Sequence, residues 1–227
     1  MAKFKATLAS RAISKAVNSA LNAELPALTK ELKEVVDDQI ELAFDPANSP
    51  EVDSMVNGRS IGSLKAQLGL TSAAQKVNLM KRSILTNVKI KRERAVGRKL
   101  GRVNIEFTPD VTAMASEGWA FQDNSGKNGP PQLPWFKWLA LSGAVVQVLG
   151  WDVYDARGTP AAKNSRSKTN VVMRKGRARS WAVPTQFAGT VNNNFVTRAL
   201  NKRLISIRRQ TDLALKTYLT RVRRRVR

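Results

Sequence analysis

The residues of this chain that could do chemistry are mainly its cations. Its 227 residues include 39 Lys and Arg against 17 Asp and Glu, a net charge of +22. The chain ends in LTRVRRRVR, with five arginines in the last seven positions. Such an excess of one sign must be compensated by something in the working state, because like charges repel one another. A polyanion is the first expectation.

Catalytic chemistry has few candidates, because the chain contains no cysteine and no histidine. These absences remove the commonest zinc ligands, the Ser-His and Cys-His nucleophile pairs, and the usual acid/base group near neutral pH. We therefore expect no enzyme activity, no metal and no cofactor. The alternative is a magnesium-dependent nuclease that uses Glu93, Glu106 and Asp110, although no motif unites these carboxylates.

Membrane association has little support in the sequence. No apolar run approaches the roughly 18 residues of a membrane span, and the N-terminus lacks a signal-peptide core with a small-residue cleavage site. We expect a soluble intracellular product with no membrane partner. A basic amphipathic helix could still bind lipid headgroups, and this reading stays open as a minor alternative.

The charge is unevenly distributed along the chain. Residues 1–60 hold nine acidic and seven basic residues. Residues 81–102 hold nine basic residues and only Glu93, and residues 157–227 hold nineteen basic residues and only Asp212. A solvated protein face normally mixes both signs, so these two basic blocks favour contact with phosphate or with an acidic protein surface.

The pattern of apolar residues predicts an α+β fold with four regions: an N-terminal helical region at 1–44, a linker at 45–60, an α+β core at 61–194 and a C-terminal helix at 195–227. Pro26 interrupts the first region, which predicts two helices or one kinked helix. The last region has apolar residues every three or four positions, which predicts a long amphipathic helix of about 45 Å. Asn192, Asn193 and Asn194 offer its N-cap.

The expected β core is small, mixed or antiparallel, and includes a basic hairpin. Val88 and Ile90 alternate with lysines, and the alternation returns at Val103, Ile105 and Phe107. A second pair is expected between residues 145–154 and 171–173. The glycines of GRKLGR, residues 97–102, lack the ending of a phosphate-binding P-loop. The cations expected to face DNA or an acidic partner are Arg92, Arg94, Arg98, Lys99, Arg102, Arg221, Arg223, Arg224, Arg225 and Arg227.

Aromatic residues gather in two stretches. In GPPQLPWFKWLALSG, residues 129–143, Pro134 can begin a short helix and Gly143 can end it. Exposed aromatic side chains could stack on nucleobases, but the scarcity of nearby cations favours packing in the core or between subunits. In residues 180–200, the asparagines are expected to cap a helix and not to form a ligand loop. The residues expected to pack are Trp135, Phe136, Trp138, Trp181 and Phe187.

With these stretches identified, the chain resembles the neck or tail-completion proteins of tailed bacteriophages. The resemblance covers residues 60–205. It rests on the order of an N-terminal helical region, IGSLKAQLG at 61–69, LPWFKWLALSG, SRS at 165–167 before VVMRKG, and WAVPTQFAGTVNNNFVTRAL before the last helix. The family offers no catalytic residues to carry over.

The resemblance implies a virion structural protein that forms a homo-oligomeric ring, a hexamer or a dodecamer, in the neck between the DNA-filled head and the tail. The α+β core would form the ring wall, and the long helices would contact neighbouring rings. Implied partners are the portal or adaptor, the tail terminator and the backbone of genomic double-stranded DNA, with assembly in the host cytoplasm. The alternative is a stand-alone, sequence-nonspecific DNA-binding protein. Both readings expect the cationic surplus to be uncompensated within one subunit.

Overall fold

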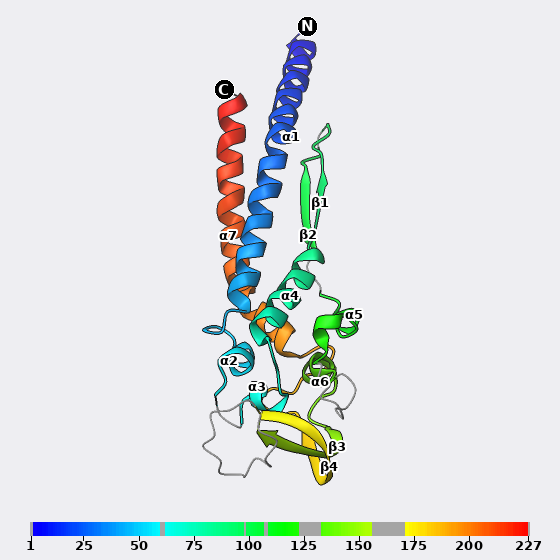
Figure 1. Ribbon diagram of the computed structural model, residues 1–227. Helices are drawn as coiled ribbons and strands as arrows, with labels where there is room; N and C mark the ends of the chain where they lie inside the picture. The colour runs from blue at the N-terminus through cyan, green and yellow to red at the C-terminus, as the bar shows by residue number, and fades with distance from the viewer. Residues whose placement is uncertain are drawn as a thin grey trace. The chain divides into compact units, whose positions relative to one another are not determined.

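The computed structural model describes residues 2–59, 62–97, 99–106, 109–122, 133–155 and 171–226, with backbone alone at 2–11, 146–155 and 171–181 (Figure 1). The chain is mostly helical and divides into two compact units. Unit 1 comprises Met1–Gln39, Thr86–Thr108 and Arg203–Arg227, and unit 2 comprises Ile40–Leu85 and Pro109–Lys202. Both ends of the chain therefore belong to the same unit.

Unit 1 is built on the greater part of two long helices, α1 (Ala2–Ala43) and α7 (Phe195–Val226). They pack side by side in opposite directions (Figure 1). The Tyr218 hydroxyl donates a 3.0 Å hydrogen bond to the carbonyl oxygen of Leu21, whereas Gln39 contacts Gln210 at 3.4 Å. The long C-terminal helix is thus confirmed, and its partner is the N-terminal helix of the same chain.

Pro26 lies inside α1 without dividing it. Proline cannot donate a backbone hydrogen bond and costs a helix interior roughly 3 kcal/mol. Burial of one leucine side chain contributes about 1.5–3 kcal/mol, so several buried leucines on the same helix outweigh that cost. The leucines that bury their side chains around Pro26 are Leu21, Leu25, Leu28 and Leu32.

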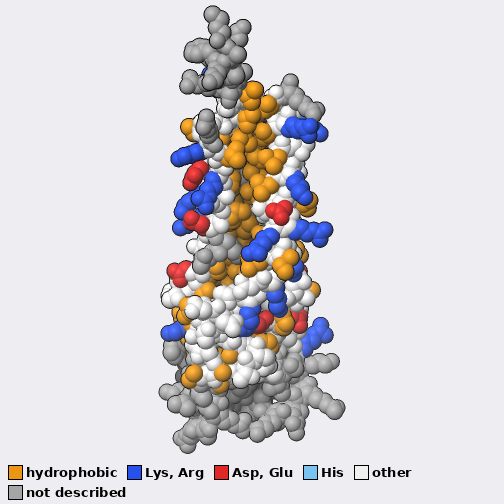
Figure 2. Space-filling view, turned by 180° about the vertical axis from the view of Figure 1, so that it is seen from behind, with side chains coloured by type: hydrophobic (Ala, Val, Ile, Leu, Met, Phe, Trp, Pro, Cys, Tyr) orange, Lys and Arg blue, Asp and Glu red, His pale blue; other side chains and the backbone are white. Residues whose placement is uncertain are grey.

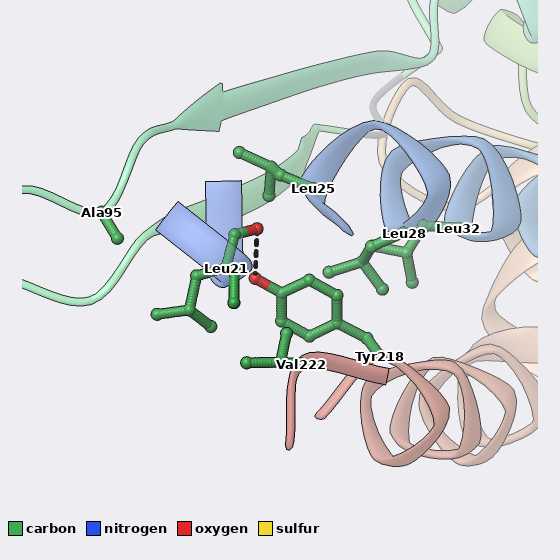
Figure 3. Packing of buried hydrophobic residues seen from close by; sticks show 8 residues of the cluster. Leu21, Leu25, Leu28, Leu32, Ala95, Tyr218 and Val222 are labelled. Atoms are coloured by element: carbon green, nitrogen blue, oxygen red, sulfur yellow. Dashed lines mark hydrogen bonds between the residues drawn. The ribbon is translucent and has the colours of Figure 1, made fainter. Parts of the chain in front are cut away.

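A narrow apolar cluster holds unit 1 together (Figure 3). From α7, Tyr218 and Val222 pack against the leucines of α1, and the Tyr218 ring lies across the seam between the helices. Ala95 of the β-hairpin completes the cluster. One stripe from each helix is thus buried, which leaves the remaining faces of both helices available for other contacts.

The basic hairpin predicted from the sequence is confirmed. Strands β1 (Lys89–Glu93) and β2 (Arg102–Glu106) pair antiparallel, with Ile90 opposite Ile105. Val103 and Ile105 pack against the apolar cluster of unit 1. Alternation along the strands therefore directs one face of the hairpin to α1 and the other to solvent.

Unit 2 consists of short elements. Its helices are α2 (Pro50–Val56), α3 (Leu64–Gln67), α4 (Ala73–Thr86, whose last residue belongs to unit 1), α5 (Val111–Met114), the 3₁₀ helix η1 (Gly118–Ala120) and α6 (Trp135–Leu141). Strands β3 (Val146–Asp155) and β4 (Val171–Ala182) pair antiparallel, as the sequence predicts. The basic loop expected between them lies outside the described residues.

The structure adds detail to two of the regions expected from the sequence. The stretch 45–60 contains α2, where Val52 and Met55 are fully buried. The Ser49 side chain caps this helix and Pro50 occupies its first turn, so residues typical of loops instead begin a helix. The expected core at 61–194 is also divided, since the hairpin belongs to unit 1.

Among the described residues, the strands form two separate two-stranded sheets. The side chains of β1 and β2 are half-buried or exposed, whereas Ala95, which follows β1, is buried. The buried side chains come mainly from helices and from the segments that join them. The expected β core is therefore replaced, over this part of the chain, by helical packing with two attached hairpins.

An aromatic cluster forms the centre of unit 2. Trp135, Phe136 and Phe195 are fully buried. The ring of Phe136 makes edge-to-face contacts with Trp119, Trp135 and Phe195 at centroid distances of 4.9, 5.6 and 5.8 Å. The Trp135 indole N–H donates to the carbonyl oxygen of Trp119 at 2.9 Å, so burial leaves this polar group satisfied.

The start of α7 is fixed by the cap that the sequence predicts. The Asn194 side chain accepts a 3.0 Å hydrogen bond from the Thr197 backbone N–H, and the Thr197 hydroxyl accepts one of 2.9 Å from Asn194 N–H. This reciprocal arrangement satisfies two donors at the helix start. Arg198, in the first turn, forms a 2.9 Å ion pair with Glu51 of α2.

Candidate anion-binding surface of unit 1

The cations of unit 1 are the strongest candidates for a functional site. This unit contains 22 Lys and Arg against 8 Asp and Glu. Chemical use of these cations depends on which of them already have carboxylate partners. The structure separates them into a paired set and an unpaired set.

Two of the terminal arginines pair with carboxylates of the same chain. Arg221 lies 2.6 Å from a carboxylate oxygen of Glu31 and 3.0 Å from one of Glu24. Arg225 lies 2.5 Å from Glu24, whose side chain is only 9% exposed. The hydrogen bond that Arg221 donates to Glu31 and the negative charges of Glu31 and Glu24 raise the pKa of Arg221, against the opposing effect of burial.

The expectation of an uncompensated surplus within one subunit is therefore wrong for Arg221 and Arg225. Their partners lie on α1, some 190 to 201 positions earlier in the chain. Glu24, Glu31 and Asp38 are spaced by seven residues, which places them on one face of a helix. That spacing, beside an Arg-x-x-x-Arg pattern on α7, was the signal that could have predicted the pairing.

Five other cations of α7 have exposed side chains. Arg223 and Arg224 are exposed and have no carboxylate partner among the residues that the structure describes. The same holds for Arg208, Arg209 and Lys216 on the same helix. Arg227 lies outside the described residues. These five described side chains form the outer basic face of α7, which is free to bind anions.

The β-hairpin divides its charge between its strands and its tip. On the strands, Lys91 forms a 2.8 Å ion pair with Glu106 and Glu93 lies opposite Arg102, so the outer face mixes both signs. The hydrogen bond from Lys91 and its charge lower the pKa of the Glu106 carboxyl. Arg92 and Arg102 are exposed on the strands.

The hairpin tip comprises residues 94–97, 99 and 100. Its Arg94 and Lys99 are exposed, with no carboxylate partner in the described part of the chain. Arg98, also expected to face an anion, lies outside that part. Two apolar side chains accompany the cations, since Val96 is 68% exposed and Leu100 78%. These two residues were not predicted from the sequence, because the cations around them are the stronger signal.

The tip is held in a fixed conformation. Val96 and Lys99 exchange two backbone hydrogen bonds of 3.1 and 3.0 Å across a tight turn, in which Gly97 has φ +60°. The side-chain amide of Asn22 pairs with both backbone groups of Ala95 at 2.8 and 3.0 Å, and Asn18 donates to the carbonyl oxygen of Gly97 at 2.8 Å. The tip is thus presented on α1 in advance of any binding event.

Figure 2 shows a stripe of apolar side chains along the long helices of unit 1, with Lys and Arg on both sides of it. On α7, the exposed apolar residues include Leu213, Leu215 and Leu219, which are 54%, 39% and 56% exposed. A groove of about 360 Å³ lies between the two helices. It is lined by Glu31, Glu34, Val35 and Asp38 of α1 and by Gln210, Leu213, Ala214 and Thr217 of α7.

The expected packing residues belong to unit 2. Trp135 and Phe136 lie in its aromatic cluster, so their rings cannot stack on a nucleobase. Trp138 and Phe187 are half-buried. The side chain of Trp181 lies outside the described residues.

The carboxylates considered for a nuclease do not form a shared centre. Asp110 caps α5 by accepting a 2.9 Å hydrogen bond from Ala113 N–H, and Glu106 pairs with Lys91. Over the described ranges, no three Asp or Glu side chains gather closely enough to hold a metal ion. A pocket of about 220 Å³ in unit 2 contains Glu41 and Asp45, but Lys81 pairs with Glu41.

Comparison with known proteins adds no relative. The chain matches no family model, and neither a curated protein nor a solved structure shows significant similarity to it. In the part of the chain that the structure describes, none of the helices has the length and apolar character needed to cross a membrane.

Proposed function

We propose that this protein is a virion structural component that forms a ring of identical subunits in the neck of a tailed bacteriophage, where it joins the head and portal to the tail. The sequence resemblance over residues 60–205 supports this proposal. The α+β part of the chain would form the ring wall, and the cations of unit 1 would line the DNA channel or seal it. Genomic double-stranded DNA, the portal or adaptor and the tail terminator are the proposed partners.

One structural observation carries the proposal. After Arg221 and Arg225 have paired with α1, the outer basic face of α7 still presents exposed cations without carboxylate partners in the described chain. Phosphate contact suits this face because it needs cations but no base-reading groups. In a ring, the same face would be repeated around the channel, so weak contacts would add by multivalency.

Oligomeric state provides the first test of the ring. We expect light scattering after size exclusion to give a multiple of the subunit mass, and electron-microscopic class averages to show closed rings. Mass spectrometry of purified virus particles should detect the chain at several copies per particle. A protein that stays monomeric at all concentrations and is absent from particles would refute the proposal.

The phosphate contact has a matched pair of variants. Arg223→Gln with Arg224→Gln removes two unpaired charges, whereas Arg221→Gln with Arg225→Gln removes two charges used within the chain. The first variant should weaken duplex DNA binding and reduce the slope of log K against log salt by about 0.9 per lost phosphate contact. The second should mainly destabilise unit 1. Equal loss of DNA affinity in both would argue against a dedicated outer face.

The same outer basic face supports a second candidate, a stand-alone DNA-binding protein without sequence preference. This candidate predicts tight binding by the isolated subunit with a steep salt dependence. The ring predicts weak binding by the isolated subunit that strengthens on assembly. Titration of DNA into protein above and below its assembly concentration distinguishes the two.

A further inference from the structure

The hairpin tip and the groove between α1 and α7 have complementary surfaces. The tip presents two exposed apolar side chains, Val96 and Leu100, together with the exposed cations Arg94 and Lys99. The groove, here called the acidic groove, has Val35, Leu213 and Ala214 among its apolar residues and Glu31, Glu34 and Asp38 as its carboxylates. We propose that the hairpin tip of one copy docks into the acidic groove of the next copy. This inference rests on the proposed ring.

The apolar residues of the tip identify the kind of partner. Phosphate contact would use Arg94 and Lys99 but would leave Val96 and Leu100 in water, 68% and 78% exposed. Burial of apolar surface contributes roughly 25 cal/mol per Å², so a partner with an apolar floor gains affinity from these two side chains. A protein groove with an acidic rim satisfies both the apolar and the cationic residues of the tip.

The acidic groove contains carboxylates that are available to bind cations. Asp38 is exposed and has no cationic partner among the described residues. Within the described ranges, the one ion pair of Glu34 is with Lys30, at 3.7 Å, and the side chains of Glu34 and Lys30 are 62% and 80% exposed. Such an exposed pair contributes little, so Glu34 can exchange this partner at small cost. Leu213, 54% exposed, supplies an apolar contact beside these carboxylates.

The tip cannot reach the groove of its own chain. Asn18 and Asn22 hold the tip against α1, whereas Glu34 and Asp38 line the groove 12 to 20 residues further along the same helix. At 1.5 Å per residue this separation is roughly 18–30 Å. The contact must therefore form between copies. Because tip and groove are different patches, it is heterologous, and a heterologous contact repeats until it closes as a ring or continues as a filament.

The fixed conformation of the tip favours such docking. Three hydrogen bonds that join the tip to Asn18 and Asn22, and the reciprocal bonds between Val96 and Lys99, order the turn before contact. Ordering a loop on binding costs free energy that a preorganised loop does not lose. Attraction between the opposite charges of tip and groove would also orient approaching subunits, although each subunit as a whole has a net positive charge.

Disulfide mapping tests the contact directly, since the chain has no cysteine of its own. A variant with Asp38→Cys and Lys99→Cys should form covalent multimers on oxidation, ending at the size of the ring. The control pairs Lys99→Cys with Lys216→Cys, which lies on α7 but is not among the residues that line the groove. Multimers specific to the first variant support the proposal, and equal amounts in both overturn it.

Charge exchange gives an independent arm. Arg94→Glu with Lys99→Glu, or Glu34→Lys with Asp38→Lys, should weaken assembly roughly tenfold or more, and the combined variant should recover it. Circular dichroism and thermal melting should show that all variants fold.

Rings that persist in both single-sided variants, without crosslinks between tip and groove, would overturn this contact and leave the proposed function standing. If the tip variant loses DNA binding but retains rings, the tip is a DNA contact and the inference is wrong. Absence of oligomers in the unmodified protein would instead refute the proposed ring.

Discussion

The two units of this chain distribute apolar and charged residues in opposite ways. Unit 2 gathers Trp135, Phe136 and Phe195 in a fully buried cluster and begins short helices with side-chain caps. Unit 1 buries one stripe along two helices, and the outer basic face of α7 has no carboxylate partner in the described part of the chain. Contacts within the unit thus determine the structure of unit 2, whereas many charged side chains of unit 1 remain on its surface, where a partner can bind them.

The comparison also separates two roles of arginine. Arg198 in unit 2 reaches the buried carboxylate of Glu51 and two further acceptors, so it serves the fold. In unit 1, Arg221 serves the fold, but its neighbours Arg223 and Arg224 have no partner in the described chain. Two arginines one turn or less apart can therefore have different roles, and net charge alone does not separate them.

The largest expected effect is in the aromatic cluster of unit 2. Phe136→Ala should lower the free energy of unfolding by about 3–5 kcal/mol, because Phe136 is fully buried and contacts three other rings. Urea unfolding followed by tryptophan fluorescence measures this change. Lys137→Ala, in the same helix but exposed, is the control and should change stability by about 0.5 kcal/mol or less. Similar losses in both variants would contradict a core specified by these rings.

The next effect concerns the seam of unit 1. Glu24→Gln should cost about 1–3 kcal/mol, because the buried Glu24 carboxylate pairs with two arginines, of which Arg225 is half-exposed and contributes less. Hydrogen exchange of the amides of α1 and α7 should report this loss. The control Asp212→Asn removes an exposed carboxylate of α7 that does not line the groove and should leave exchange unchanged. Faster exchange in the control alone would show that Glu24 is not the central partner.

The features that could be predicted from the sequence are those that depend on residues close together along the chain. The capped helix α7 and the hairpin were predictable because the contacts that define them are local. The cap joins Asn194 to Thr197 three residues later, and the hairpin pairs Ile90 with Ile105 across one turn. The pairing of Glu24 with Arg225 was not predicted, since it joins residues 201 positions apart. Pro26 left two helices or one kinked helix open, and tertiary burial of the neighbouring leucines favours the single helix α1.

A smaller effect should distinguish the rigid hairpin tip from the rest of unit 1. Asn22→Ala removes two hydrogen bonds with the backbone of Ala95, a residue that is only 3% exposed. The substitution should lower the local free energy of unfolding by about 1–2 kcal/mol. The amide of Ala95 should then exchange roughly tenfold faster. Asn104→Ala, on the opposite face of the hairpin, is the control. If both variants leave the Ala95 amide protected, Asn22 does not hold the tip.

The smallest effect lies at the centre of the helical seam, where Tyr218→Phe removes one buried hydrogen bond to Leu21 and should cost about 1 kcal/mol at pH 8. Burial, and then the charge of Glu24, raise the pKa of Tyr218 above its ordinary 10.0. The folded state therefore favours the protonated phenol, and the stability that this group contributes is complete below pH 10.0 and falls as the pH rises through the folded pKa. Urea unfolding of both proteins at pH 8 and above pH 10.0 measures the difference. The advantage of the tyrosine protein should shrink at the higher pH, because phenylalanine does not titrate. An advantage that is constant across this range would mean that the pKa of Tyr218 is the same in the folded protein as in the unfolded chain.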